Sequence, residues 1–191
     1  MTTIKIRSNV FETNSSSVHT LVFHKTDIQN VIDDTPMDIR GGSYGRLPQP
    51  PLTSLYDRLN YLWTAIWEAN IKYVKVNTEW IKVLNKEEIQ WWKDAIHLYC
   101  PNAILYDLKD EDWYGVDHTT LLENLLSAMK TDISILKDFL LDPDGTIYID
   151  GDEFYEDEVP FNRNDLPHVG WTNSEQLIEF KPDSFVYVKG N

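Results

Sequence analysis

The order of hydrophobic patterns along the chain restricts its fold more than any other feature of the sequence. Runs rich in β-branched and aromatic residues lie near both ends, whereas the middle repeats apolar residues at helical spacing. Strands and helices do not alternate regularly, and this order favours an α+β domain over a doubly wound parallel sheet. We therefore expect short strands from both ends of the chain to pack with a central group of about four helices.

Caps and turn residues give the expected bounds of these elements. Ser54 and Asn85 are good helix N-caps, and Pro101 ends the helix that Asn85 begins. We expect helices at 54–70, 85–100, 120–129 and 132–141, a short helix at 78–84, and strands at 4–6, 18–24, 103–106, 146–149 and 185–188. Glycines and prolines mark 33–52 as a long loop within a single domain of residues 1–191.

The charge balance restricts the partners that such a chain can bind. Its 191 residues include 31 acidic and 17 basic side chains, a formal net charge of −14, and the 42 % of apolar residues is enough for a folded core. An acidic surface repels the phosphates of DNA and RNA, so we expect no direct nucleic-acid binding. A basic groove on another protein would instead attract this surface.

Cysteine content and apolar runs exclude several further classes. Cys100 is the only cysteine, so an intrachain disulfide or a cysteine-based zinc site within one chain cannot form. No apolar run approaches the roughly 20 residues that cross a bilayer, and residues 1–7 do not resemble a signal peptide. We expect a cytoplasmic protein that uses no membrane, cofactor or metal.

The most unusual polar stretch is Glu12-Thr13-Asn14-Ser15-Ser16-Ser17, which lies between two apolar runs. Asn and Ser side chains bond readily to nearby backbone, so one interpretation is a self-satisfied turn. In the other, the turn holds a phosphate or carboxylate, Arg7 and His19 add donors, and Glu12 acts as a base, or a Ser hydroxyl pairs with His19 as a nucleophile. A strand at 18–23 would place His19 on one face with Leu21 and Phe23, so a buried core histidine is a competing interpretation.

The residues from Arg7 to Leu21 also carry a resemblance to known proteins. They resemble the start of a group of bacterial and bacteriophage proteins that share a Phe-Glu-Thr-Asn-Ser-Ser-Ser-x-His motif, here Phe11 to His19. The resemblance is restricted to residues 7–21 and implies a phage or bacterial origin, with a bacterial host cell as the location. It implies no activity, because none is known for the group, but it favours a role for the motif beyond that of a turn.

A second polar stretch gathers six carboxylates with no basic residue among them. These are Asp150, Asp152, Glu153, Glu156, Asp157 and Glu158. A solvated acidic face is the simplest interpretation, and a patch that mimics phosphates and docks in a basic groove is another. A metal site is disfavoured, because the nearby Asp142-Pro143-Asp144-Gly145 does not follow the spacing of a calcium loop.

Aromatic residues add a further argument for protein binding. Trp91 and Trp92 cannot both face one core, because neighbours on a helix point about 100° apart. Exposed aromatic side chains beside acidic groups are typical of protein interfaces. The sequence thus favours a small acidic phage-type accessory protein that binds and modulates a host protein with a basic surface. A nucleic-acid-handling or defence factor, bound by nucleic-acid mimicry, is one version of this hypothesis.

Two alternatives stay open at this point. One is an enzyme or ligand-binding domain that uses the N-terminal motif on a nucleotide or a phosphorylated small molecule. The other is a structural or assembly protein of a virion, for which self-association is the function. The sequence leaves open whether the chain is an enzyme and whether it forms a homo-oligomer.

Overall fold

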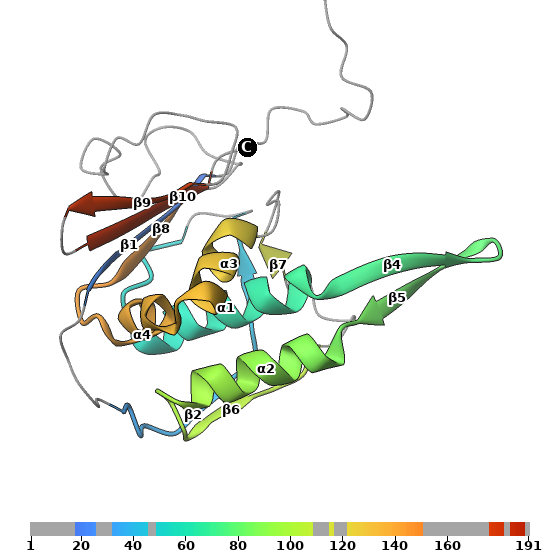
Figure 1. Ribbon diagram of the computed structural model, residues 1–191, viewed down its shortest axis with the longest axis horizontal. Coiled ribbons are helices and arrows are strands. Elements are labelled where there is room, and N and C mark those ends of the chain that lie inside the picture. Colours follow the sequence, from blue (N-terminus) through green and yellow to red (C-terminus); the bar gives the residue numbers. More distant parts are fainter. Residues whose placement is uncertain are drawn as a thin grey trace, which may run out of the picture.

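The computed structural model describes residues 18–25, 32–45, 49–108, 115–116, 122–150, 176–181 and 184–189. Figure 1 shows an α+β fold in which a sheet lies along one side of a group of helices. The helices are α1 (Leu55–Ala69), α2 (Lys86–His97), α3 (Glu123–Thr131) and α4 (Ile133–Leu141). The strands are β1 (Val18–His24), β2 (Met37–Ile39), β3 (Ser43–Tyr44), β4 (Ile71–Val76), β5 (Glu79–Leu84), β6 (Ala103–Leu105), β7 (Gly115–Val116), β8 (Thr146–Asp150), β9 (Gln176–Lys181) and β10 (Ser184–Lys189).

The main sheet joins the two ends of the chain. Its strands are antiparallel in the order β8-β1-β10-β9, and His19 on β1 lies opposite Lys189 on β10 and Ile149 on β8. The expected strands near both ends are confirmed, except that the strand expected at 4–6 lies outside the described residues. On β1, the alternate residues His19, Leu21 and Phe23 are buried. The Phe23 ring meets the edge of the Phe139 ring on α4 at a centroid distance of 5.7 Å.

Helix α1 occupies the centre of the core. The Ser54 side chain caps it as expected, accepting the backbone N–H of Asp57 at 3.1 Å. Residues 58–67 are buried without interruption, because α2, α4 and the small strands β2 and β7 contact the helix on different sides. Burial on every side is typical of a helix inside a core rather than on its surface.

The stretch expected as a long loop, 33–52, contributes to the core. It contains β2 and β3, which pair in parallel with β6 and β7 far along the chain. Met37, Ile39, Tyr44 and Leu52 are buried. These strands are too short for a sequence period to emerge, and distant partners supply their backbone hydrogen bonds, so local sequence could not reveal them.

The helix expected at 78–84 is wrong. Residues 71–84 form a β-hairpin in which β4 and β5 pair antiparallel, with Val74 opposite Ile81. The chain reverses at Asn77, whose φ of 56° lies in the left-handed region that Asn tolerates better than most residues. The hairpin projects from the rest of the molecule (Figure 1).

Among the described residues, no helix combines the length and the apolar character that spanning a membrane requires.

Candidate functional site

Most residues of the two expected polar sites lie outside the described part of the chain. In the N-terminal motif these are Arg7, Glu12, Thr13, Asn14, Ser15, Ser16 and Ser17, and in the acidic stretch they are Asp152, Glu153, Glu156, Asp157 and Glu158. Asp150 ends β8, where it lies opposite Val18 in the sheet. Of the motif itself, only His19 has a described side chain.

His19 belongs to the core. Its side chain is fully buried, and its Nδ1 atom hydrogen-bonds with the Tyr61 hydroxyl of α1 at 2.8 Å. The Tyr61 ring in turn meets the Tyr44 ring at a centroid distance of 5.0 Å. Burial, together with the charge of Asp57, raises the pKa of Tyr44 well above its usual range, so its hydroxyl stays protonated at neutral pH. The core-histidine interpretation of His19 is therefore the one that the described contacts support.

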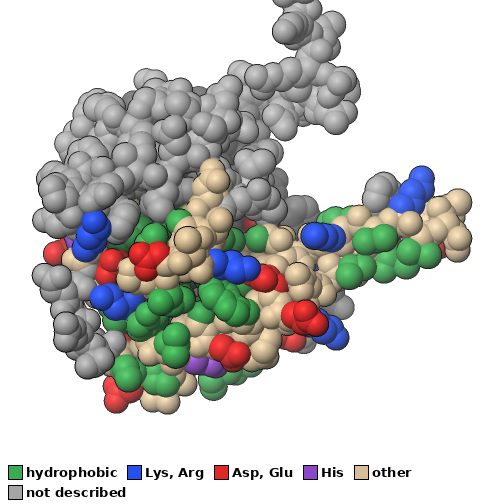
Figure 2. Space-filling view, viewed as in Figure 1, with side chains coloured by type: hydrophobic (Ala, Val, Ile, Leu, Met, Phe, Trp, Pro, Cys, Tyr) green, Lys and Arg blue, Asp and Glu red, His purple; other side chains and the backbone are tan. Residues whose placement is uncertain are grey.

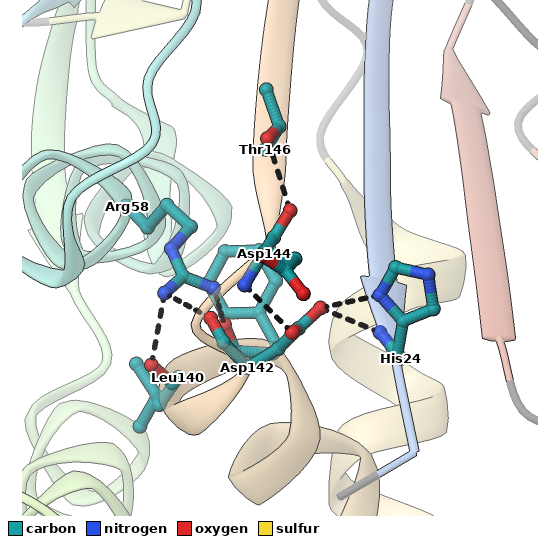
Figure 3. A network of polar contacts seen from close by, with 7 residues as sticks. His24, Arg58, Leu140, Asp142, Asp144 and Thr146 are labelled. Carbon is teal, nitrogen blue, oxygen red and sulfur yellow. Dashed lines mark hydrogen bonds and ion pairs between the residues drawn. The ribbon is translucent and has the colours of Figure 1, made fainter.

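A buried polar cluster ties α1, α4 and β1 together (Figure 3). The Arg58 guanidinium donates to the carbonyl oxygens of Phe139 at 2.7 Å, Leu140 at 3.3 Å and Asp142 at 2.7 Å. These carbonyls lie at the end of α4, where helical acceptors have no partner within the helix. Burial lowers the pKa of Arg58, and the charge of Asp142 opposes this shift. Arg58 thus acts as the cap of α4.

The Asp142 carboxylate adds a second set of contacts to this cluster. It accepts the backbone N–H of His24 at 2.7 Å, the ring Nδ1–H of His24 at 2.9 Å, and the backbone N–H of Asp144 at 2.9 Å. A carboxylate that orients an imidazole also occurs in catalytic sites. Among the described residues, however, no hydroxyl or thiol group bonds to His24. We therefore interpret the cluster as the joint that fixes the end of β1 to the end of α4.

Where the structure describes the chain, the remaining groups with catalytic or metal-binding potential are buried or lie apart from one another. Cys100 is buried, and burial raises the pKa of its thiol to about 12, so it is protonated and a poor nucleophile at neutral pH. Within the described ranges, no group of three or more His, Cys, Asp or Glu side chains is placed to hold a metal ion.

The β4–β5 hairpin presents the most exposed apolar surface of the described residues. Four side chains on one face, Val74, Val76, Ile81 and Val83, are each 45–46 % exposed. Antiparallel pairing sets Val74 opposite Ile81, with Val83 and Val76 on either side of them. Figure 2 shows these hydrophobic side chains along the projecting part of the molecule. We call residues 71–84 the β4–β5 arm and these four residues its apolar stripe.

The arm differs in charge from the rest of the chain. The arm contains three lysines, Lys72, Lys75 and Lys82, and one acid, Glu79, so it carries 3 − 1 = +2. The register places Lys72 and Glu79 on the face of the apolar stripe and the other two lysines on the opposite face. The chain as a whole carries −14, so the remainder carries −14 − 2 = −16. A ribbon of net positive charge therefore extends from an acidic body, with the apolar stripe on one face and two of the three lysines on the other.

The sequence did contain a signal for the arm. Residues 71–76 and 79–84 are rich in β-branched and aromatic residues and are separated by Asn77-Thr78 alone. Two such runs around a two-residue turn that begins with Asn are typical of a hairpin.

The expectation for Trp91 and Trp92 on α2 is confirmed. Trp92 is buried, whereas Trp91 is 37 % exposed, and the centroid of its ring lies 5.3 Å from the Lys130 ammonium group.

Comparison with models of protein families, with curated proteins and with solved structures found no match for this chain.

Proposed function

We propose that the protein is a small acidic accessory protein that acts by binding another protein, with the β4–β5 arm as its contact. One observation carries this proposal: the apolar stripe of the arm is left nearly half exposed by the body of the chain. Contiguous exposed apolar residues on a projecting element are typical of interaction sites, because they lose contact with water only when a partner covers them.

The partner in this proposal is a protein of the bacterial host cell. The resemblance of residues 7–21 supports a phage or bacterial setting. The net charge of −14 supports a partner with a basic surface that would meet the acidic body beside the arm. A nucleic-acid-handling or defence factor fits this chemistry, since such proteins carry basic grooves.

Binding is favoured over catalysis by the state of the motif histidine. His19 is fully buried and bonded to Tyr61, so it packs with the core rather than facing a substrate. Two further buried charged groups are also occupied by structural contacts. Arg58 donates to backbone carbonyls at the end of α4, and the Asp142 carboxylate accepts from His24 and from the backbone N–H of Asp144.

A capture experiment with matched variants tests this proposal. Tagged wild-type protein is incubated with bacterial lysate at moderate salt, and bound proteins are quantified by mass spectrometry beside Val74→Thr/Ile81→Thr. Threonine keeps the β-branched shape and the strand preference but removes apolar surface. The control is Tyr73→Thr, because Tyr73 lies on the same strand but on the other face of the arm and is 64 % exposed.

We expect one near-stoichiometric host protein that wild type and control retain and that the double variant loses at least tenfold. The same ranking should return when the partner is purified and titrated directly. Equal retention by the double variant would show that the arm is not the contact, and capture of nothing above background would overturn the binding function for that host.

A further inference from the structure

The face of the arm that carries the apolar stripe has charges of opposite sign at its two ends. The strand register places Lys72 on this face at the base of the arm, where it lies opposite Val83. Glu79 lies on the same face at the tip, opposite Val76. Both charged side chains are exposed, and four residues of extended strand, about 13 Å, separate the two ends, too far for a close ion pair within one arm. The stripe face therefore runs from a positive base through an apolar middle to a negative tip.

The excess positive charge of the arm lies on its other face. Lys75 and Lys82 alternate with the stripe residues along their strands, so they point away from the stripe, as Tyr73 does. The +2 of the whole arm is therefore not the charge of the stripe face, on which one lysine balances one glutamate. Such a face can pack against a copy of itself without bringing the two excess lysines of each arm together.

A hollow lies at the base of the arm, on the side of the stripe. Its volume is about 480 Å³, and it is lined by Lys72, Val83, Leu84, Asn85, Lys86 and Glu87. Lys72 and Val83 belong to the stripe face, and Asn85 to Glu87 form the start of α2. Two lysines and one glutamate give the wall a net charge of +1. An acidic side chain of a partner would find both space and opposite charge there.

A two-fold axis through the middle of the stripe brings these features together. When two arms pack stripe to stripe in opposite directions, Val74 and Ile81 of one copy meet the same pair of the other, because they lie opposite each other at the middle of the ribbon. The tip of each arm then lies over the base of the other, so Glu79 of one copy meets Lys72 and the hollow of its partner. A two-fold interface requires a surface that is self-complementary in this way.

This arrangement also keeps the acidic bodies apart. The arm projects from the rest of the molecule (Figure 1), so the two bodies lie at opposite ends of the paired arms. Their separation is then about 20 Å, the length of a six-residue strand. At physiological ionic strength, charges more than about 8 Å apart are largely screened. The repulsion between two bodies of −16 therefore opposes the contact only weakly.

We infer that the protein forms a two-fold dimer in which the β4–β5 arms of two copies pack stripe to stripe and antiparallel. The inference rests on the proposed function in one respect, that the stripe binds protein, and it names a second copy as the occupant when no host partner is bound. Among the described residues, β4 and β5 form a sheet of two strands alone, and a second ribbon supplies the burial that such a sheet lacks. Because the dimer covers the stripe, self-association and host binding exclude each other.

Charge reversal at the two ends of the stripe tests this arrangement. Sedimentation velocity of the full chain at about 1–200 µM and physiological salt should show the 22.3 kDa chain approaching twice its mass as concentration rises. We expect Lys72→Glu and Glu79→Lys each to raise the dissociation constant of the dimer at least tenfold, because each makes both end contacts like-charged. The matched control, Lys75→Glu, reverses a lysine on the opposite face and should leave the dissociation constant unchanged.

Mixing the two variants tests which ends meet. Lys72→Glu has two glutamates on its stripe face and Glu79→Lys has two lysines, so in a mixed dimer both end contacts join opposite charges. We expect the mixture to associate about as strongly as wild type, although each variant alone is weakened. The double variant Lys72→Glu/Glu79→Lys should also regain self-association. Arms that ran in the same direction would already join like charges in wild type, so single reversals without effect would overturn the inference.

Two further outcomes would also overturn it: a monomer throughout the concentration range, or a mixture that associates no more than its separate variants. Failure here is separable from failure of the proposed function. A monomeric wild type that still captures a host protein through the stripe would refute self-association and leave the host contact standing, and a dimer that captures no host protein would do the reverse. Circular dichroism and thermal unfolding of each variant confirm that a loss of mass is not a loss of folding.

Discussion

At the scale of single residues, Arg58 shows how one side chain can hold distant parts of the fold together. Its guanidinium reaches from α1 to three carbonyl oxygens at the end of α4, and a Cβ added at Gly145 would lie 2.0 Å from its Nη1 atom. The glycine is therefore required by the close approach of the arginine. Nothing in the local sequence around either residue indicates that they meet.

Replacing Arg58 should cost more stability than a typical surface change. In Arg58→Met the three carbonyls lose their buried donor, and we expect the free energy of unfolding to fall by about 3 kcal/mol. Gly145→Ala should cost about 2 kcal/mol, because the guanidinium is held by its hydrogen bonds and cannot retreat freely. Urea unfolding of the single and double variants should show a double loss smaller than the sum, by about 1 kcal/mol or more. Additive losses would contradict the predicted clash.

Asp132 gives a prediction about pH. Its carboxylate caps α4, and hydrogen bonds from the Ser134 hydroxyl at 2.6 Å and the Ser134 backbone N–H at 2.9 Å lower its pKa. A carboxyl whose pKa is lowered by folding stabilises the fold above its unfolded pKa of about 3.9, and this contribution is lost as the pH falls through the folded pKa.

Asp132→Asn keeps a capping oxygen but removes the charge. Because Asp132 is exposed, solvent screens the effect, and we expect wild type to be more stable by about 0.5 kcal/mol at pH 5–7. The difference should shrink below about pH 4. Urea midpoints at several pH values measure it, with Asp34→Asn, an exposed carboxyl outside any helix cap, as the control. A difference that grows in acid would refute the assigned sign.

At the scale of elements, those with local signals were the predictable ones. Helix α1 begins after Ser54 and helix α2 after Asn85, as capping residues and helical spacing predict. The inward face of β1 followed from the alternation of His19, Leu21 and Phe23. The second strand of the arm differs from the helix expected at 78–84, because a run of six residues with four apolar ones is too short to distinguish a strand from a helix by its period.

The arm should be dispensable for the stability of the body. Of the arm's described side chains, only those of Ile71 and Leu84, its first and last residues, pack against the core, and these two residues lie opposite each other in the ribbon. Replacing residues 72–83 with Asn-Gly joins these two residues through a favoured two-residue turn. We expect the thermal midpoint of this variant to stay within about 3 °C of wild type, measured by calorimetry in dilute solution. A fall of about 10 °C or more would show that the arm belongs to the cooperative core.

At the scale of the whole molecule, the net charge of −14 predicts that the protein does not bind polyanions such as DNA. We expect no retardation of a short DNA duplex at physiological salt with up to about 10 µM protein, because few phosphates can be neutralised by a basic surface. Gel-shift experiments at two salt concentrations measure this, with a basic DNA-binding protein as the positive control. Retardation that weakens steeply with added salt would show that basic side chains of the protein bind phosphates and would contradict this prediction.

Sequence patterns do not predict which strands and side chains from distant elements contact one another. The fold class follows from the order of strand-like and helix-like runs, but strand order depends on partners that lie at opposite ends of the chain. The cluster of Arg58, Asp142 and His24 likewise joins residues from three separate elements. The arm could be recognised as a hairpin from its turn, but its role as a candidate interface depends on what the body leaves uncovered.

The pairing of β1 with β10 also bears on how the chain folds during synthesis. The ribosome delivers β1 early, yet both of its neighbours in the sheet, β8 and β10, emerge far later. Until β8 and β10 have been synthesised, β1 has no strand of the main sheet to pair with, so His19, Leu21 and Phe23 are not yet buried. Contacts between residues so far apart in the sequence also form slowly. The main sheet of a nascent chain is therefore complete only when its last strand has emerged. A truncation before β10 would leave β1 as an edge strand, paired with β8 alone and open to aggregation on its other side.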